Sequence, residues 1–257
     1  MIYLFSGTPG SGKSLHVAEK LYYWNRQGRP CICNFEIALD KIPGSRQKDF
    51  HFVSNRDLNP DDLIAFAQEY HQKIGRIRES SILLVVDECQ LVFNARDWNM
   101  RGRDRWLEFF TLHRHWGYDI ILIAQFDRMI DRQIRSLIEY EYIHRKIKNM
   151  GWRGKLVSWF ALGNLFIAVK VWYPMKMKVG QEMFRASKKY YQLYDTFMML
   201  EKAEKPEKQS KKQNVIHIRD AAPAPADVFE IQAEDPGVAS EGGETPEAAP
   251  EGPVSAV

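Results

Sequence analysis

Apolar residues follow two spacings along the first half of the chain. Continuous apolar runs are typical of strands covered on both faces, whereas apolar residues three and four positions apart indicate helices. The continuous runs predict strands at Ile2–Phe5, Pro30–Asn34, Ser81–Asp87 and Asp119–Gln125. The helical spacing predicts helices at Leu15–Gln27, Pro60–Arg78 and Arg105–His115. Residues 35–59 show neither pattern and are expected to be irregular, and the alternation of strands with helices favours an α/β fold with a parallel sheet.

The pattern changes after Gln125. Two longer segments, Glu139–His144 and Asn164–Tyr173, are expected to be strands that extend the sheet in antiparallel fashion. Leu156–Val169 comes nearest to a membrane span, but its 14 residues fall short of the number that a spanning helix needs, which is about 20. We therefore expect a buried hairpin there, and contact of this segment with a membrane stays open.

The net charge of +3 conceals two parts of opposite sign. Residues 1–219 hold all 36 Lys and Arg residues and 24 of the 33 acidic residues, a net charge of +12, whereas residues 220–257 have a net charge of −9. Seven of the 12 prolines lie in residues 201–257, where few apolar residues remain to offset the entropy of ordering. We expect a globular domain over residues 1–200, a charged linker over 201–219 and a disordered acidic tail, rich in Pro, Ala and Glu, over 220–257.

Cysteine usage and the first residues bear on the cellular compartment. Cys31, Cys33 and Cys89 are too few for a disulfide framework and fit a reducing compartment. One residue separates Cys31 from Cys33 and no second pair is nearby, so packing sulfurs are favoured over a zinc site. The first residues lack the charged leader and long apolar run of a signal peptide, so no secretion signal is expected.

The turn after the first expected strand carries the phosphate-loop motif G-x-x-x-x-G-K-[ST] in full. Its residues are Gly7, Thr8, Pro9, Gly10, Ser11, Gly12, Lys13 and Ser14. A strand before the motif and a helix after it are the required context, because loop N–H groups and the helix N-terminus together face an anionic phosphate. Lys13 is expected to contact the β- and γ-phosphates of ATP, and the Ser14 hydroxyl to bind Mg²⁺.

Two adjacent acids, Asp87 and Glu88, follow the clearest apolar strand. In a parallel α/β sheet the nucleotide lies at the carboxyl ends of the strands, which is where these two acids stand. We expect Asp87 to hold Mg²⁺, commonly through water, and Glu88 to act as a general base on the attacking water. The alternative is a solvated acidic turn. Adjacent Asp and Glu favour ATP hydrolysis over transfer to a small acceptor.

Gln125 and a group of arginines complete the candidate site. Gln125 ends the next apolar strand, where it could sense the γ-phosphate or position water, the alternative being an ordinary strand-end glutamine. Arg128 is the best candidate for an arginine finger that acts in a neighbouring subunit's site, although a surface charge explains it as well. His113 and His115 are two residues apart, a poor spacing for a metal site on one helix face, so packing or surface positions are expected.

These segments together resemble a known family. The phosphate loop, the strand Ile82–Glu88, the stretch His113–Gln125, Ile134-Arg135 before Tyr140, and Tyr191–Asp195 look like the zonular occludens toxin (Zot) domain. The resemblance covers roughly residues 1–200, and the family includes the assembly and export ATPases of filamentous bacteriophages. It implies a P-loop ATPase of the additional-strand type, in which the strand of Gln125 lies between the phosphate-loop strand and the strand of Asp87.

The resemblance also implies partners and a location. DNA-pumping relatives work as rings, so a homo-oligomer is expected, with a hexamer as one candidate. Family members commonly carry one membrane-spanning helix after the ATPase domain, whereas residues 201–257 contain no such helix. We expect a protein of the host bacterial cytoplasm at the cytoplasmic face of the inner membrane, docked on a separate inner-membrane phage assembly partner.

Three functions fit these features. The leading one is an ATPase that couples hydrolysis to extrusion of phage DNA and virion assembly. The second is a translocase or packaging ATPase that contacts nucleic acid directly, which the basic body would favour. The third, a small-molecule kinase, is disfavoured by Asp87 and Glu88, and a GTPase is disfavoured because the chain lacks an Asn-Lys-x-Asp guanine signature.

Overall fold

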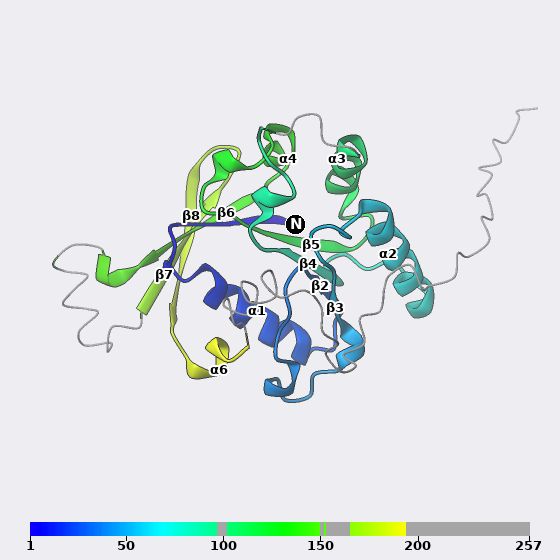
Figure 1. Ribbon diagram of the computed structural model, residues 1–257, viewed down its shortest axis with the longest axis horizontal. Coiled ribbons are helices and arrows are strands. Elements are labelled where there is room, and N and C mark those ends of the chain that lie inside the picture. Colours follow the sequence, from blue (N-terminus) through cyan, green and yellow to red (C-terminus); the bar gives the residue numbers. More distant parts are fainter. Residues whose placement is uncertain (97–101, 150–151, 153–164, 194–257) are drawn as a thin grey trace, which may run out of the picture. The chain divides into compact units, whose positions relative to one another are not determined.

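The computed structural model describes residues 1–96, 102–149, 152 and 165–193 (Figure 1). Within these residues one eight-stranded sheet runs in the order β3-β2-β4-β5-β1-β6-β7-β8. The expected linker, the expected acidic tail and residues 156–164 of the expected hairpin lie outside the described part of the chain. No helix in the described part is both long and apolar enough to cross a bilayer.

Six of the strands are parallel, which confirms the expected α/β class. They are β1 (Ile2–Ser6), β2 (Cys31–Cys33), β3 (Phe50–Phe52), β4 (Ile82–Val86), β5 (Tyr118–Ile123) and β6 (Tyr140–Lys146). β5 lies between β1 and β4, since Ile120 pairs with Ile2 on one side and with Leu84 on the other. The phosphate-loop strand and the strand of Asp87 are therefore separated by one strand, as the resemblance implied.

Two expectations about the sheet were wrong. β3 falls within residues 35–59, which were expected to be irregular, because its three half-buried residues are too few to show a period. β6 pairs in parallel with β1, with Tyr142 opposite Phe5, so it does not belong to the antiparallel extension. The helix that makes this parallel connection, α4 (Arg132–Ser136), has only five residues and leaves little periodic signal.

The antiparallel extension consists of the hairpin β7 (Leu165–Trp172) and β8 (Met177–Arg185). β7 pairs antiparallel with β6, and β8 pairs antiparallel with β7 along the outer edge of the sheet. β8 escaped the sequence analysis because most of its residues are exposed, and polar residues alternate with Met and Val along it. The part of the expected hairpin that the structure describes, Leu165–Val169, is strand.

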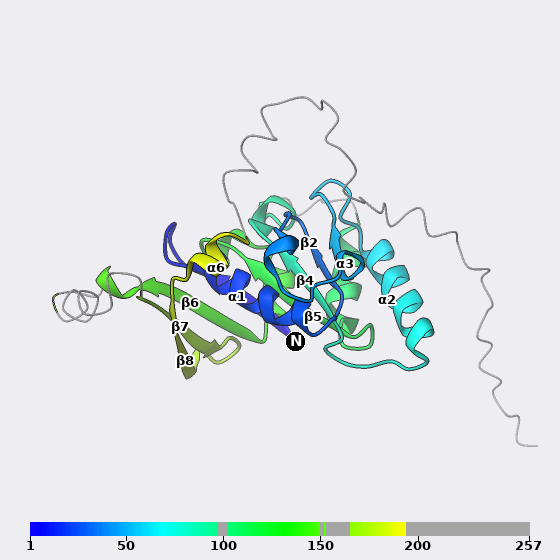
Figure 2. The same cartoon turned by 90° about the horizontal axis from the view of Figure 1, so that it is seen from below.

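Helices cover both faces of the sheet and define two cores. α1 (Lys13–Arg26) and the short α6 (Lys188–Tyr191) lie together on one face (Figure 2). α2 (Pro60–Ile74), α3 (Arg103–Leu112) and α4 pack on the other face. β1 serves both layers, because Leu4 packs with the side chains of α2 and α3 whereas Phe5 packs with those of α1.

Local signals explain where α2 begins and ends. The Asn59 side chain accepts a hydrogen bond from the Asp61 N–H at 3.0 Å, and Pro60 takes the first helical position, where its missing N–H costs nothing. Gly75 ends the helix in the left-handed region, with φ of 69°. The helix therefore ends at Ile74, earlier than the expected Arg78.

Candidate nucleotide-binding site

The phosphate-loop motif connects β1 to α1 as the sequence predicts. Gly7, Gly10 and Gly12 have φ values of 140°, 72° and 99°, a region that side chains with a Cβ rarely occupy. The Gly7 N–H donates to the Gln125 carbonyl at 3.2 Å, which ties the start of the loop to the end of β5. The glycines thus give the loop a conformation that other residues would strain.

Two glycines of the loop pack closely against β6 and β7, the strands that lie beyond β1 on the side away from β5. A Cβ at Gly12 would lie 2.7 Å from the Phe166 ring on β7, and a Cβ at Gly7 would lie 2.7 Å from the His144 carbonyl on β6. Both distances are shorter than van der Waals contact. β6 and β7 therefore form a wall against which the loop is packed.

Substituting Gly12 by Ala should destabilise the protein by about 1–3 kcal/mol, because the new methyl group meets Phe166 and the backbone has a positive φ. Gly75→Ala is the matched control, since Gly75 has φ of 69° but nothing within 4 Å of a built Cβ. Urea unfolding measures both changes. An equal loss in the two variants would show that contact with Phe166 contributes nothing.

Lys13 is the first residue of α1, and its side chain folds back over the loop. Its Nζ donates to the Gly7 carbonyl at 2.7 Å and to the Thr8 carbonyl at 3.3 Å. Burial lowers the pKa of Lys13, whereas the negative charges of Glu88 and Asp87 raise it. The expected loop lysine and the expected acids therefore share one electrostatic environment.

Asp87 and Glu88 follow β4 in a constrained turn. Asn34, which follows β2, accepts a hydrogen bond from the Asp87 N–H at 2.7 Å and donates to the Asp87 carbonyl at 2.8 Å. The Glu88 N–H donates to Asp87 Oδ1 at 2.8 Å. Glu88 itself has φ of 45° and ψ of 47°, an unusual conformation for a residue with a side chain. Its carboxylate accepts a hydrogen bond from Gln90 Nε2.

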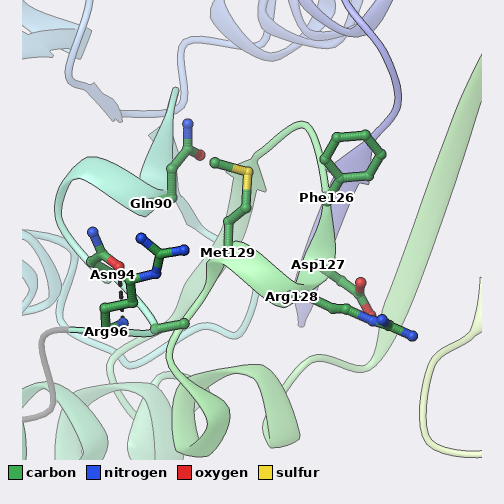
Figure 3. Close-up of a pocket in the computed structure, with 8 residues that line it drawn as sticks. Gln90, Asn94, Arg96, Phe126, Asp127, Arg128 and Met129 are labelled. Atoms are coloured by element: carbon green, nitrogen blue, oxygen red, sulfur yellow. Dashed lines mark hydrogen bonds between the residues drawn. The ribbon is translucent and has the colours of Figure 1, made fainter.

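Gln125 and Arg128 lie on the segment that follows β5. Gln125 contacts the phosphate loop through its carbonyl, which accepts from the Gly7 N–H. Arg128 is exposed on the turn Asp127–Met129, and in Figure 3 it extends away from Gln90 and Arg96. Whether Arg128 acts in another subunit stays a prediction.

A pocket of about 650 Å³ is lined by the segments that follow β4 and β5. One wall includes Gln90 and Arg96, and the other includes Phe126 and Met129 (Figure 3). The phosphate-loop residues do not line it. It adjoins the site through Gln90, which holds the Glu88 carboxylate.

The loop region fits a phosphate group and a divalent cation. The Ser11 hydroxyl is buried within the loop and has no hydrogen-bond partner in the described structure, so it has a donor to spare. Positive φ at three glycines turns the loop backbone in the way that anion-binding loops require. The hydroxyl of Ser14 and the carboxylate of Asp87 are oxygen ligands of the kind that Mg²⁺ prefers.

The cysteines and the two histidines of the His113–His115 stretch occupy ordinary structural positions among the described residues. Cys31, Cys33 and Cys89 are all buried and free, as expected of packing sulfurs, and the described residues contain no cluster that could hold a metal through three His, Cys, Asp or Glu side chains. His113 is buried against the Phe110 carbonyl and His115 is exposed.

The sequence analysis missed the residues that support the site. Asn34 and Gln90 hold the Asp87–Glu88 turn, and neither belongs to a recognisable motif. His16 lies within α1, where its spacing is that of an ordinary core residue. A polar residue directly after the apolar run of β2 is the one signal that could have singled out Asn34.

Comparisons with known proteins agree with this arrangement. The family model of zonular occludens toxin (Zot) matches residues 1–199. The Gene 1 protein of Enterobacteria phage fd is 30% identical over 151 residues, which cover 56% of this chain and 41% of that protein. The Gene 1 protein of Salmonella phage IKe is 27% identical over 175 residues, covering 64% of this chain and 46% of that protein. The chain thus spans less than half the length of these curated relatives.

Two solved structures are similar to this chain at lower sequence identity. The N-terminal domain of zonular occludens toxin from Neisseria meningitidis is 22% identical with a TM-score of 0.44, covering 76% of this chain and 98% of that one. The genome packaging NTPase B204 from Sulfolobus turreted icosahedral virus 2, in complex with ATP-gammaS, is 16% identical with a TM-score of 0.42, covering 72% and 96%. Because the family model matches well over half of its residues, this chain belongs to the zonular occludens toxin (Zot) family.

Proposed function

We propose that this protein is an ATP-hydrolysing motor that couples hydrolysis to the extrusion of phage DNA and virion assembly. One observation carries the ATPase assignment: a complete phosphate loop with Lys13 follows β1, and Asp87 and Glu88 follow β4 at the same carboxyl edge of the parallel sheet, two strands away. The phage role is supported by the names of the relatives, which include Gene 1 proteins of Enterobacteria phages and the "Putative assembly protein ORF301" of Pseudomonas phage Pf3.

The residues divide the work of hydrolysis as follows. The loop N–H groups, with Lys13, bind the nucleotide phosphates and hold the terminal one in place. Ser14 and Asp87 would hold Mg²⁺, which supplies neutralisation of phosphate charge when it is bound. Glu88, oriented by Gln90, takes a proton from the attacking water. Gln125 would sense the terminal phosphate, and its carbonyl bond to Gly7 links β5 to the loop.

A homo-oligomeric ring is part of the proposal, with an inner-membrane assembly partner at the cytoplasmic face. Arg128 is exposed and would enter the site of an adjacent subunit. The position of Arg128, on the turn after β5 at the carboxyl edge of the sheet, supports this role. Analytical ultracentrifugation with and without nucleotide would measure the state of assembly.

The test is phosphate release by the purified protein with ATP and Mg²⁺, in the presence and absence of membranes that contain the phage assembly proteins. Hydrolysis that rises when the assembly proteins are present supports the export function. Absence of ATP binding and hydrolysis under every condition would contradict the ATPase assignment.

The runner-up, a translocase that contacts nucleic acid itself, rests on the +12 charge of residues 1–219. It predicts hydrolysis that is stimulated by single- or double-stranded DNA alone and falls steeply as salt rises. Stimulation by DNA without any assembly protein would place this function first.

A further inference from the structure

A chain of polar side chains, buried at His144 and His16 and half-exposed at Glu182, lies directly behind the phosphate loop. His144 Nδ1 contacts the Ser6 carbonyl at 3.2 Å, His144 Nε2 contacts His16 Nδ1 at 2.8 Å, and His16 Nε2 contacts Glu182 Oε2 at 3.1 Å. Three elements besides β1 contribute, namely β6, α1 and β8. None of these side chains belongs to the phosphate-loop motif or to the acidic turn, and we call the three of them the His16–His144–Glu182 relay.

The chemistry of the two ends sets the direction of the hydrogen bonds. A carbonyl oxygen can only accept, so His144 carries a proton on Nδ1 and donates it to Ser6. Burial lowers the pKa of His144 to about 3, so this ring is neutral and its Nε2 accepts from His16. At the other end Glu182, whose pKa is lowered to about 2 mainly by its hydrogen bond with His16, is ionised and can only accept. His16 therefore donates from both ring nitrogens, which makes it an imidazolium paired with Glu182, although burial lowers the pKa of His16.

Aromatic packing fixes the relay in place. The His16 ring lies between Phe5 and Phe184, with centroid distances of 4.9 Å and 4.7 Å and interplanar angles of 25° and 24°. His16 and His144 are each 2% exposed. Tyr142 donates to the second oxygen of Glu182 at 3.0 Å. Replacing a buried polar group together with its partners by apolar residues is often neutral for stability, so these polar groups are consistent with a requirement for geometry.

The relay ends on the peptide unit where the phosphate loop begins. A peptide unit is planar, so the Ser6 carbonyl and the Gly7 N–H turn together. His144 holds the carbonyl and the Gln125 carbonyl holds the Gly7 N–H at 3.2 Å, so this plane is fixed from both sides. The Ser6 hydroxyl is also tied down, since it donates to the buried Glu141 at 2.6 Å. Rotation of the plane would swing the first residues of the loop.

We propose that His16, His144 and Glu182 are positioning residues for the nucleotide site, which hold the Ser6–Gly7 peptide so that the phosphate loop stands in its phosphate-binding conformation. This inference rests on the proposed ATPase function. Loss of the relay weakens nucleotide binding, because the N–H groups of the phosphate loop no longer point toward the same phosphate group. It leaves the turnover rate of bound nucleotide nearly unchanged, because Lys13 and Glu88 are untouched.

The decisive experiment compares two substitutions of His144. Gln keeps one donor for Ser6 and one acceptor for His16, whereas Phe fills the aromatic surroundings but has neither. We expect His144→Phe to raise the KM for ATP about tenfold with kcat changed less than twofold, and His144→Gln to stay within about threefold of the wild-type KM. A packing role predicts the reverse order, since Phe suits an aromatic core better than Gln. That reverse order, or equal KM values in both variants, would overturn the proposal.

A second pair of variants tests the far end of the relay. Glu182→Ala removes the last acceptor and should raise the KM in the same direction as His144→Phe. Gln181→Ala is the matched control, because Gln181 is the neighbouring residue on β8 and its exposed side chain accepts from Lys178 at 2.9 Å. If the two variants have the same KM, Glu182 has no part in positioning.

Failure of the proposed function can be told apart from failure of the relay. If the wild-type protein neither binds nor hydrolyses ATP, the proposed function fails, and the amide NMR signal of Gly7 still tests the relay. His144→Phe should move that signal more than His144→Gln does. An unmoved Gly7 signal in His144→Phe would overturn the relay whatever the activity.

Discussion

Lys13→Ala should reduce ATP hydrolysis to the background of the assay, a loss on the order of 10²-fold or more. Lys13 is the one side-chain cation of the phosphate-loop motif, and burial of its ammonium group in the loop makes its charge effective there. Alanine removes the charge that faces the terminal phosphates and the donor that now contacts the Gly7 and Thr8 carbonyls. Phosphate release with saturating ATP measures the loss.

The control for this variant is Lys73→Ala. Lys73 lies on α2, is exposed, and pairs with Glu69 at 2.5 Å one helical turn away. Both variants should keep the fold, which circular dichroism and thermal unfolding would check. Wild-type hydrolysis by the Lys13 variant would remove the phosphate loop from the mechanism, and an equal loss in the Lys73 variant would point to an indirect cause.

Glu88→Gln should stop turnover while ATP still binds. Glutamine has the shape of glutamate and can stay in contact with Gln90, but its amide cannot take a proton from water. The expected loss in kcat is about 10²–10⁴-fold, the range of general-base catalysis. A fluorescent ATP analogue should bind this variant with an affinity near that of the wild type, which distinguishes it from Lys13→Ala.

Glu108→Gln is the matched control for Glu88→Gln, since Glu108 on α3 is exposed and pairs with Arg105. It should hydrolyse ATP at the wild-type rate. If Glu88→Gln also did so, the base would have to be sought elsewhere, and the strained backbone at Glu88 would need another explanation.

Much of the fold could be predicted because its parallel strands are buried on both faces. β4 and β5 are continuous apolar runs, and α1 and α2 carry clear helical spacing with recognisable ends. The phosphate loop could be identified because its chemistry depends on glycines and a lysine at set positions along the chain. The Asp87–Glu88 pair could be placed because the strand order brings the carboxyl ends of β1, β4 and β5 to one edge.

The elements and residues that were not predicted depend on contacts between residues far apart in sequence. β3 and β8 are edge strands, where exposure removes the apolar pattern, and the parallel pairing of β6 was missed because α4 is only five residues long. His144 and Glu182 meet His16 from positions 128 and 166 residues away, so no local spacing connects them.

Glu88 combines a backbone conformation that lowers the stability of the protein with the side chain proposed as the base for ATP hydrolysis. A non-glycine residue in the left-handed region costs about 1–3 kcal/mol, and Glu88 stays there with φ of 45° because Asp87 and Gln90 hold it. Glycine would release that free energy and remove the proposed base in the same change. Selection for heat resistance alone would therefore tend to replace Glu88, whereas selection for the proposed ATP hydrolysis would retain it.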